Sequence, residues 1–157
     1  MDPPIAQGLR DLLETQRIGS LGTLHAGEPY VSMVPFALLP REAAFVIHVS
    51  RLAAHTKDML ESPAVSLLVV APASAVTPPQ ATARVTIHAD ATPLPASGAA
   101  HAEAKKAYLE RFPESEMMFE LADFSLFALK PRSIRFVGGF AQAKTITPEG
   151  LAEVLRV

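Results

Sequence analysis

Polar side chains that can bind an anion gather in one short segment of this charge-poor sequence, HVSRLAAHTKDMLESP at positions 48–63. They are Ser50, Arg51, His55, Thr56 and Lys57. An apolar stretch ends just before them, and a helix is predicted to begin near Ala53. The start of a helix presents free backbone N–H groups and the positive end of the helix dipole, which favour a bound phosphate. Hydroxyl groups and cations beside it would add charge-assisted hydrogen bonds.

The same residues also have a purely structural interpretation, which composition alone favours. Ser50 would cap the helix, and Arg51 and Lys57 would be solvated. The residues by themselves leave both interpretations open.

Other reactive constellations are absent from the sequence or incomplete. There is no cysteine, which excludes disulfides, zinc–thiolate sites and thiol catalysis within the chain. The five histidines show no close pair at metal-ligand spacing, and although His55 and Asp58 are three positions apart, nothing visible completes a site. GSLG at positions 19–22 lacks the pattern of a serine nucleophile elbow. We therefore predict no metal site and assign no catalytic residue.

Composition limits the class of protein. A chain of 157 residues suits a single domain over positions 1–157 with a sizeable core. Hydrophobic residues make up 49% and charged residues 19%, below the usual ~25%, so we expect part of the surface to be covered in a homodimer. The net charge of −2 and the lack of a basic block argue against nucleic acid as a partner.

The sequence gives no sign of export or of membrane insertion. The N-terminal MDPP lacks the basic region and apolar run of a signal peptide. The longest apolar run, around positions 65–71, is too short to span a bilayer. A cytoplasmic protein without a membrane partner is the expectation.

Hydrophobic periodicity indicates a mainly β chain with a few helices. Strands are predicted at 17–24, 30–39, 43–49, 64–71, 81–91, 124–129 and 133–140. Helices are predicted at 4–15, 53–61, 100–112 and 114–121, with a last helical turn from 147. Pro35 indicates an edge or a bulge in its strand, and the two glycines in 17–24 would let another group approach closely. The stretch 64–71 is too apolar to alternate and is expected in the interior.

Six to eight strands joined mostly by short turns predict a closed or nearly closed antiparallel barrel with flanking helices. Four blocks of the sequence, in this order, make the prediction more specific: VSMVPFALL, HVSRLAAHTKDMLESPAVSLLV, ATARVTIHADATPL and FSLFALKPRSIRFVGGFAQA. They resemble the pyridoxamine 5′-phosphate oxidase-like FMN-binding split barrels, and most of all the branch that includes HugZ-type haem-utilisation proteins. The resemblance covers nearly the whole chain.

The resemblance implies a fold, an assembly and a cofactor. The fold is mainly β (α+β): a six-stranded antiparallel split β-barrel of Greek-key type with short flanking helices. The assembly is a homodimer that holds FMN between its protomers. The phosphate of FMN would lie at the helix start described above, on Ser50, Arg51, His55, Thr56 and Lys57. The other implied cofactor contacts are Ser32, Met33, Val34 and Pro35 beside the isoalloxazine ring, and Arg84 as a polar contact to the flavin.

Two departures from the family pattern bear on activity. The pyridoxamine oxidases proper carry cations on the strand that here reads VSMVPFALL, and basic residues near the C-terminus where only Lys144 stands. Pyridoxamine 5′-phosphate is therefore not the expected substrate. The haem-degrading relatives use a histidine beyond the last strand, and no histidine follows His101.

Three functions remain open. The first is an FMN-dependent oxidoreductase acting on an unknown small-molecule substrate, in which the flavin supplies the redox chemistry. The alternative is a haem-binding or haem-utilisation protein without flavin turnover. The third is a barrel that serves only in dimeric interaction.

Overall fold

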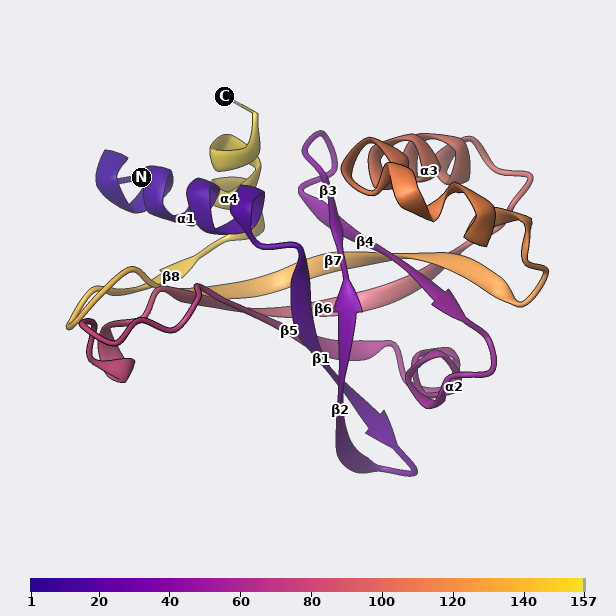
Figure 1. The fold of residues 1–157 in the computed structure, drawn as a ribbon, viewed down its shortest axis with the longest axis horizontal. Coiled ribbons are helices and arrows are strands. Elements are labelled where there is room, and N and C mark those ends of the chain that lie inside the picture. The colour runs from indigo at the N-terminus through magenta and orange to yellow at the C-terminus, as the bar shows by residue number, and fades with distance from the viewer. Residues whose placement is uncertain (157) are drawn as a thin grey trace.

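The computed structural model of the chain describes residues 1–156, in which eight strands form one antiparallel sheet (Figure 1). The strands are β1 (Ile18–His25), β2 (Glu28–Pro35), β3 (Ala37–Leu39), β4 (Ala44–Ser50), β5 (Ala64–Val70), β6 (Arg84–Leu94), β7 (Phe124–Val137) and β8 (Ala143–Ile146). The helices are α1 (Pro3–Thr15), α2 (Ala54–Glu61), α3 (Ala99–Arg111) and α4 (Pro148–Leu155), with 3-10 helices η1 (Pro79–Ala81) and η2 (Pro113–Glu120).

The order of the strands explains why the sheet curls. It runs β2-β1-β5-β6-β7-β4-β3, and β8 pairs with β7. The strands at the two ends of this order, β2 and β3, are separated in the chain by Phe36 alone. The sheet must therefore bend round until its ends meet. This arrangement confirms the split-barrel class of the sequence prediction.

The number and limits of the strands differ from the prediction. The predicted strand 30–39 is two strands, because the chain leaves edge strand β2 at Pro35 and resumes as β3 at the other end of the sheet. The predicted strands 124–129 and 133–140 are one strand, β7. Pro131 fits within it because the register with β6 shifts between His88 and Ala89, and a bulge tolerates the missing N–H donor. With the unpredicted β8, eight strands replace the expected six.

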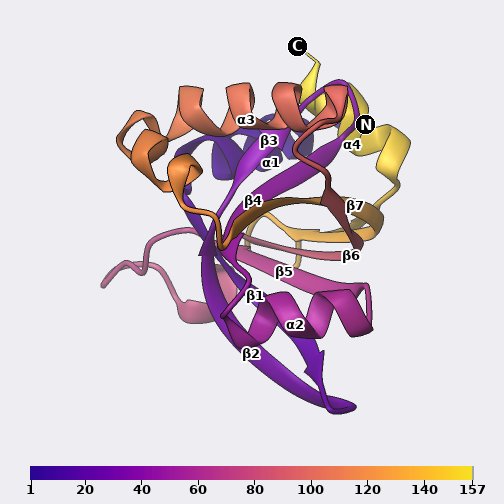
Figure 2. The same cartoon turned by 90° about the vertical axis from the view of Figure 1, so that its right-hand side faces the viewer.

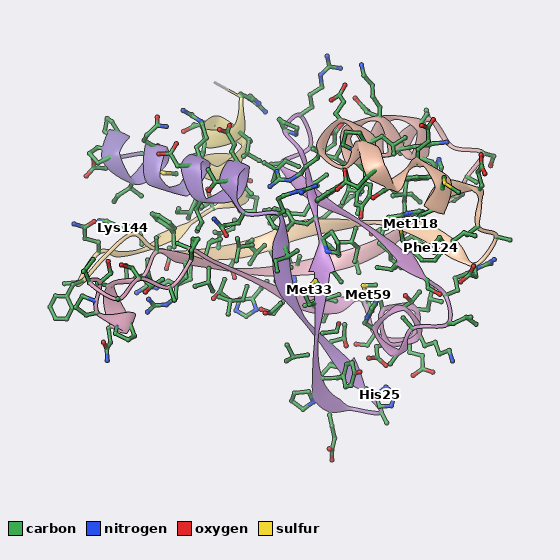
Figure 3. The ribbon with its side chains drawn as sticks, in the orientation of Figure 1. His25, Met33, Met59, Met118, Phe124 and Lys144 are labelled. Carbon is green, nitrogen blue, oxygen red and sulfur yellow. The ribbon has the colours of Figure 1, made fainter. Side chains whose placement is uncertain are left out.

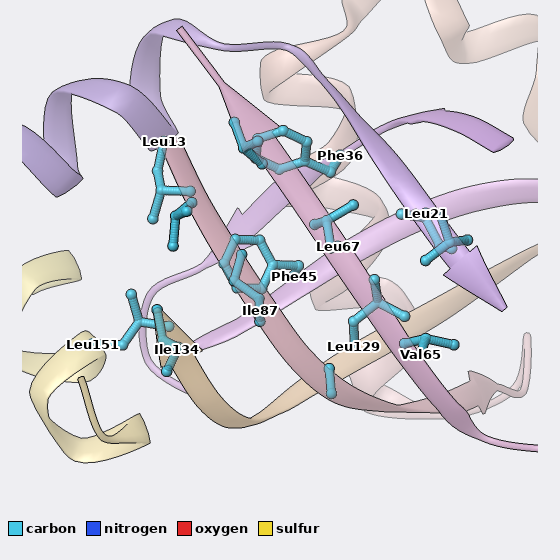
Figure 4. Packing of buried hydrophobic residues seen from close by; sticks show 14 of the residues in the cluster. Leu13, Leu21, Phe36, Phe45, Val65, Leu67, Ile87, Leu129, Ile134 and Leu151 are labelled. Atoms are coloured by element: carbon cyan, nitrogen blue, oxygen red, sulfur yellow. The ribbon is translucent and has the colours of Figure 1, made fainter. Parts of the chain in front are cut away.

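The main core fills the barrel, and helices α1 and α4 close one end of it (Figure 4). The outward and inward positions alternate along β6 as predicted, with Val85, Ile87 and Ala89 buried. They alternate along β5 as well, which the sequence did not indicate. Val65, Leu67 and Val69 point into the core, while the residues between them are partly exposed. The prediction that the whole of 64–71 lies in the interior is therefore wrong.

A second, smaller core lies outside the barrel under α3. The helix packs across β3, β4 and β7 (Figure 2). Its Tyr108 and the following Phe112 belong to the same buried cluster as Val46 and Leu126. Helix α2 packs instead against β1 and β2. None of the helices in residues 1–156 combines the length and the hydropathy that crossing a membrane requires.

Candidate functional site

The helix start predicted from the sequence is present, but Ser50 does not cap it. Helix α2 begins at Ala54 after β4, its N-cap is Ala53, and no side chain caps it. The hydroxyl of Ser50 donates to the carboxylate of Asp123 at 2.8 Å and accepts the N–H of Leu52 at 3.2 Å. Ser50 thus joins the end of β4 to the residue just before β7, which corrects the capping interpretation.

The other predicted phosphate contacts around Ser50 differ in whether their polar groups are already hydrogen-bonded within the protein. Thr56 is buried, and its hydroxyl donates to the carbonyl of Ser50 at 2.6 Å. The guanidinium of Arg51 donates to the carbonyl of Ala122. Lys57 is exposed in the first turn of α2. The structure brings these residues together at one end of the sheet, and phosphate binding there stays a prediction.

A denser polar cluster lies on the side of α2 that faces the β1–β2 hairpin. Asp58 is only 3% exposed, and its carboxylate accepts two hydrogen bonds. One comes from the hydroxyl of Thr23 at 2.8 Å, and the other from Nδ1 of His25 at 2.7 Å. One turn earlier on α2, Nδ1 of His55 lies 3.1 Å from the hydroxyl of Ser32. Figure 3 shows His25 near the tip of the hairpin.

The electrostatics of this cluster keep Asp58 ionised. Burial alone would raise the pKa of Asp58, but hydrogen bonds from Thr23 and His25, with the charges of His25 and His55, outweigh burial and hold that pKa below its ordinary value. For His55, in contrast, burial is the larger of the two effects on the pKa. Burial lowers the pKa of this imidazole, and the nearby Asp58 only partly offsets it. The site therefore contains a fixed anion that is hydrogen-bonded to the imidazole of His25, with the imidazole of His55 nearby on the same helix.

The remaining predicted cofactor residues do not share one surface. Because side chains alternate along β2, Ser32 faces α2, Met33 is exposed on the outer face and Val34 is buried. Pro35 ends the strand. If all four residues contact the isoalloxazine ring, they must do so through their backbone atoms, because their side chains point in different directions.

Arg84 lies at the opposite end of the sheet. It opens β6 opposite Val137, and its guanidinium donates to the carbonyls of Gln80 and Thr82 at 3.2 and 2.9 Å. Ser50, in contrast, pairs with Phe124 at the start of β7. Within one chain, the structure does not bring Arg84 to the other predicted residues.

Sequence reasoning missed Thr23 and His25 as partners of Asp58. Positions 23 and 25 alternate onto one face of β1, but the predicted strand 17–24 ends one residue before His25 and so leaves it out. In the structure, β1 extends to His25. Residues 1–156 contain no group of three or more metal-ligating side chains placed to share an ion, so any metal there would need further ligands from elsewhere.

Comparison with known proteins places this chain in a family. The model of the family described as pyridoxamine 5′-phosphate oxidase matches residues 5–138. The chloroplastic heme oxygenase HOZ of Arabidopsis thaliana is 34% identical over 139 residues, which are 86% of this chain and 40% of that protein. The heme oxygenase HutZ of Vibrio cholerae is 25% identical over 151 residues, 95% of this chain and 85% of that protein.

A solved structure agrees with these relatives. The heme binding protein from Mycobacterium smegmatis superposes with a TM-score of 0.85 and 32% sequence identity over 98% of this chain and 62% of that chain. The chain thus spans less than two thirds of the length of this protein and of the Arabidopsis relative. The residues that match the family model cover strands β1 to β7 and helices α2 and α3. This chain belongs to the pyridoxamine 5′-phosphate oxidase-like split-barrel family, near its HugZ-type haem-utilisation branch.

Proposed function

We propose that this protein binds haem and acts in haem utilisation. One observation carries the proposal: two proteins more than 30% identical to most of this chain are named for haem, one as a heme oxygenase and the other as a heme binding protein. Haem thereby takes the place of FMN as the first candidate cofactor.

The outer face of the β1–β2 hairpin offers the apolar contact that a haem group needs. A haem needs broad apolar contact for its faces and one or two protein ligands for its iron, because the porphyrin supplies four nitrogens. On the β1–β2 hairpin, Val31 is 67% exposed and Met33 is 61% exposed. The exposed imidazole of His25 lies on the opposite face of this hairpin, with Thr23 and Tyr30, so it does not share a surface with Val31 and Met33. When bound, haem would supply redox and oxygen chemistry, while Val31 and Met33 would contact its faces.

We also propose that the protein is a homodimer with the cofactor at the protomer interface. The outer face of β1 and β2 presents Ile18, Val31 and Met33, each more than half exposed. The strand register places Ile18 opposite Pro35 and Ser20 opposite Met33, so these side chains share one face. Contiguous exposed apolar surface of this kind is typical of an interface. A second copy of the chain would cover it.

Titration of the purified apoprotein with haemin tests the proposed function. We expect a saturable Soret band with a dissociation constant in the micromolar range or tighter, measured by difference spectroscopy. Serum-albumin-free buffer with haemin alone provides the blank for aggregation. A protein that produces no saturable Soret change, yet is folded by circular dichroism, would contradict the proposal.

A flavin-dependent oxidoreductase is the second candidate, because Lys57 stands exposed in the first turn of α2, next to the free N–H groups of the helix. If Lys57 binds the phosphate of FMN, Lys57→Ala weakens FMN about 10–150-fold and leaves riboflavin, which has no phosphate, unchanged. Lys106→Ala, an exposed lysine of α3, is the matched control. Equal losses for both flavins, or none for FMN, would contradict a phosphate contact at Lys57.

A further inference from the structure

His88 lies on the same outer face of the sheet as Val31. The strand register forms one row across β2, β1, β5 and β6, in which Val31 pairs with Gly22, Gly22 with Ser66, and Ser66 with His88. Residues that pair across strands point to the same face of a sheet. The neighbours of His88 along β6 are buried in the core, so its exposed imidazole points outward.

A groove of about 300 Å³ follows this row on the surface. Its apolar lining comes from the hairpin, with Leu24, Pro29 and Val31, and its imidazole comes from His88 on β6. Val31 and His88 are separated by three strand spacings, or roughly 14 Å. The residues between them in the row are a glycine and a serine, whose small size leaves room above the sheet. The groove therefore offers apolar surface and a metal-ligating ring over the span of a flat macrocycle.

Arg132 also lines the groove, and its cation suits a carboxylate. Its Nε lies 3.4 Å from Oδ1 of Asp90 in an exposed ion pair. The two terminal nitrogens of the guanidinium have no hydrogen-bond partner within residues 1–156, so they remain available to a ligand. A guanidinium can donate two parallel hydrogen bonds to one carboxylate. Haem carries two such groups, its propionates.

The other four histidines lack this combination. His25 and His55 each use Nδ1 in a hydrogen bond within the protein. His48 is buried among aromatic rings. His101 lines a different cavity, of about 470 Å³, whose lining includes none of the exposed apolar residues of the proposed protomer interface. The groove beside His88, in contrast, is continuous with that interface through Val31.

We propose that His88 is a protein ligand to the iron of haem and that Arg132 binds a propionate of the same group. The proposal rests on the proposed haem function and on the proposed protomer interface. The groove would contact one face of the macrocycle, and a second copy of the chain would cover the other. One imidazole from the chain suffices without a cluster of ligands, because the porphyrin supplies four nitrogens to the iron.

Spectroscopy of haemin-loaded His88→Gly tests the iron ligand. We expect the optical and electron paramagnetic resonance spectra to lose the histidine-ligated form found in wild type, and millimolar imidazole to restore it. Haemin affinity should fall at least about tenfold, since loss of even an outer partner of a metal ligand costs that much. His101→Gly removes the histidine of the other cavity and is the matched control, which should keep the wild-type spectra and affinity.

Arg132→Gln tests the propionate contact. Loss of hydrogen bonds to a charged group should weaken haemin about 10–150-fold, while the histidine-ligated spectrum stays as in wild type. Haemin dimethyl ester, in which both propionates are uncharged, should bind wild type and variant equally. Arg41→Gln, at an arginine whose side chain is 87% exposed outside the groove, should bind haemin as wild type does. Equal losses for haemin and its dimethyl ester would overturn the role of Arg132.

The outcomes separate the ligand from the function. If wild type binds haemin and His88→Gly keeps the wild-type spectra, the assignment of His88 is wrong and the haem function stands. Loss of the histidine-ligated form in His101→Gly alone would place haem in the other cavity and also overturn the assignment. If folded wild type binds no haemin, both fail.

Folding of the variant is the remaining control, because glycine weakens a strand. Circular dichroism checks each variant, and His88→Ala repeats the test with a smaller effect on β6. Support requires that imidazole restore the histidine-ligated spectrum. A folded variant at His88 that imidazole does not rescue, or a folded His88→Ala with wild-type spectra, would overturn the assignment.

Discussion

The imidazole of His48 lies flat on the ring of Phe119, with 3.8 Å between ring centroids and 7° between ring planes. Tyr108 and Phe124 lie on other sides of it, with centroids 5.7 and 5.2 Å away. Nδ1 of His48 is buried without a hydrogen-bond partner among the described residues. The second core therefore encloses an imidazole that is neutral, because no neighbouring group in residues 1–156 is placed to stabilise its protonated form.

This burial predicts a fall in stability at mildly acidic pH. Burial, with the positive charges of His101 and Lys105, lowers the pKa of His48 from 6.5 to about 4. The unfolded chain therefore takes up the proton first. The contribution of neutral His48 is fully present above about pH 6.5 and is lost as the pH falls toward 4, by roughly 1–3 kcal/mol.

Urea unfolding of wild type and His48→Phe at pH 7 and pH 4.5 measures this contribution. The aromatic substitute keeps the stacking and removes the titration. We expect the free energy of unfolding to fall less in the variant than in wild type over this range. An equal fall in both proteins would show that carboxylates elsewhere cause the acid sensitivity and that His48 does not.

Gly19 is expected to be sensitive to the smallest side chain. A Cβ placed there would lie 2.7 Å from Cδ1 of Leu67 and 3.2 Å from the carbonyl oxygen of Leu68, because β1 and β5 approach closely. Gly19→Ala should destabilise the fold by about 1–3 kcal/mol through overpacking. Gly22→Ala, whose Cβ would be 3.5 Å from the carbonyl of Ser66, is the control on the same strand. Equal melting temperatures for the two variants would contradict the steric explanation.

Arg111 ties the second core to the end of α1. Its guanidinium donates to the carbonyls of Leu13 and Gln16 and lies 4.9 Å from the ring centroid of Phe36. Arg111→Ala should lower the free energy of unfolding by about 1.5–3 kcal/mol, the range for hydrogen bonds to a charged group. Lys106→Ala on the same helix, where the ion pair is exposed, should change it by less than about 0.5 kcal/mol. Chemical denaturation distinguishes the two, and a loss at Lys106 as large as at Arg111 would refute this ranking.

The proposed dimer makes a prediction for the outer face of β2. A charge at Met33 would be buried unpaired in the interface, so Met33→Glu should dissociate the dimer at micromolar concentration. Val76→Glu, at a 91% exposed site in the β5–β6 connection, is the control and should stay dimeric. Light scattering reads out the mass. Wild type that shows only a 16.8 kDa species would contradict the dimer.

The features that local sequence determines were predicted well. The two faces of β6 can be read from the sequence because polar and apolar residues alternate along it. The start of α2 near Ala53 can be read from the end of the apolar strand before it. Pro35 correctly marked an edge, since β2 is the outermost strand of the order.

The features that depend on distant partners were not predicted. The chain continues through Pro131 as one strand because β6 shifts its register beside it, and nothing in the local sequence shows that partner. The contact between His25 and Asp58 joins positions 33 residues apart, and it forms only when α2 folds back on the hairpin. Side-chain chemistry can therefore be recognised in the sequence, whereas its assembly into a site requires the topology.

The identity of the cofactor that the protein retains when it is purified without added ligand tests the central claim most directly. The protein would be produced in cells supplied with both iron and riboflavin, and its cofactor would be released by denaturation. We expect the pyridine haemochromogen spectrum of haem in the extract, in amounts approaching one haem per dimer or more, and no flavin fluorescence. Stoichiometric FMN without haem in that extract would contradict the account.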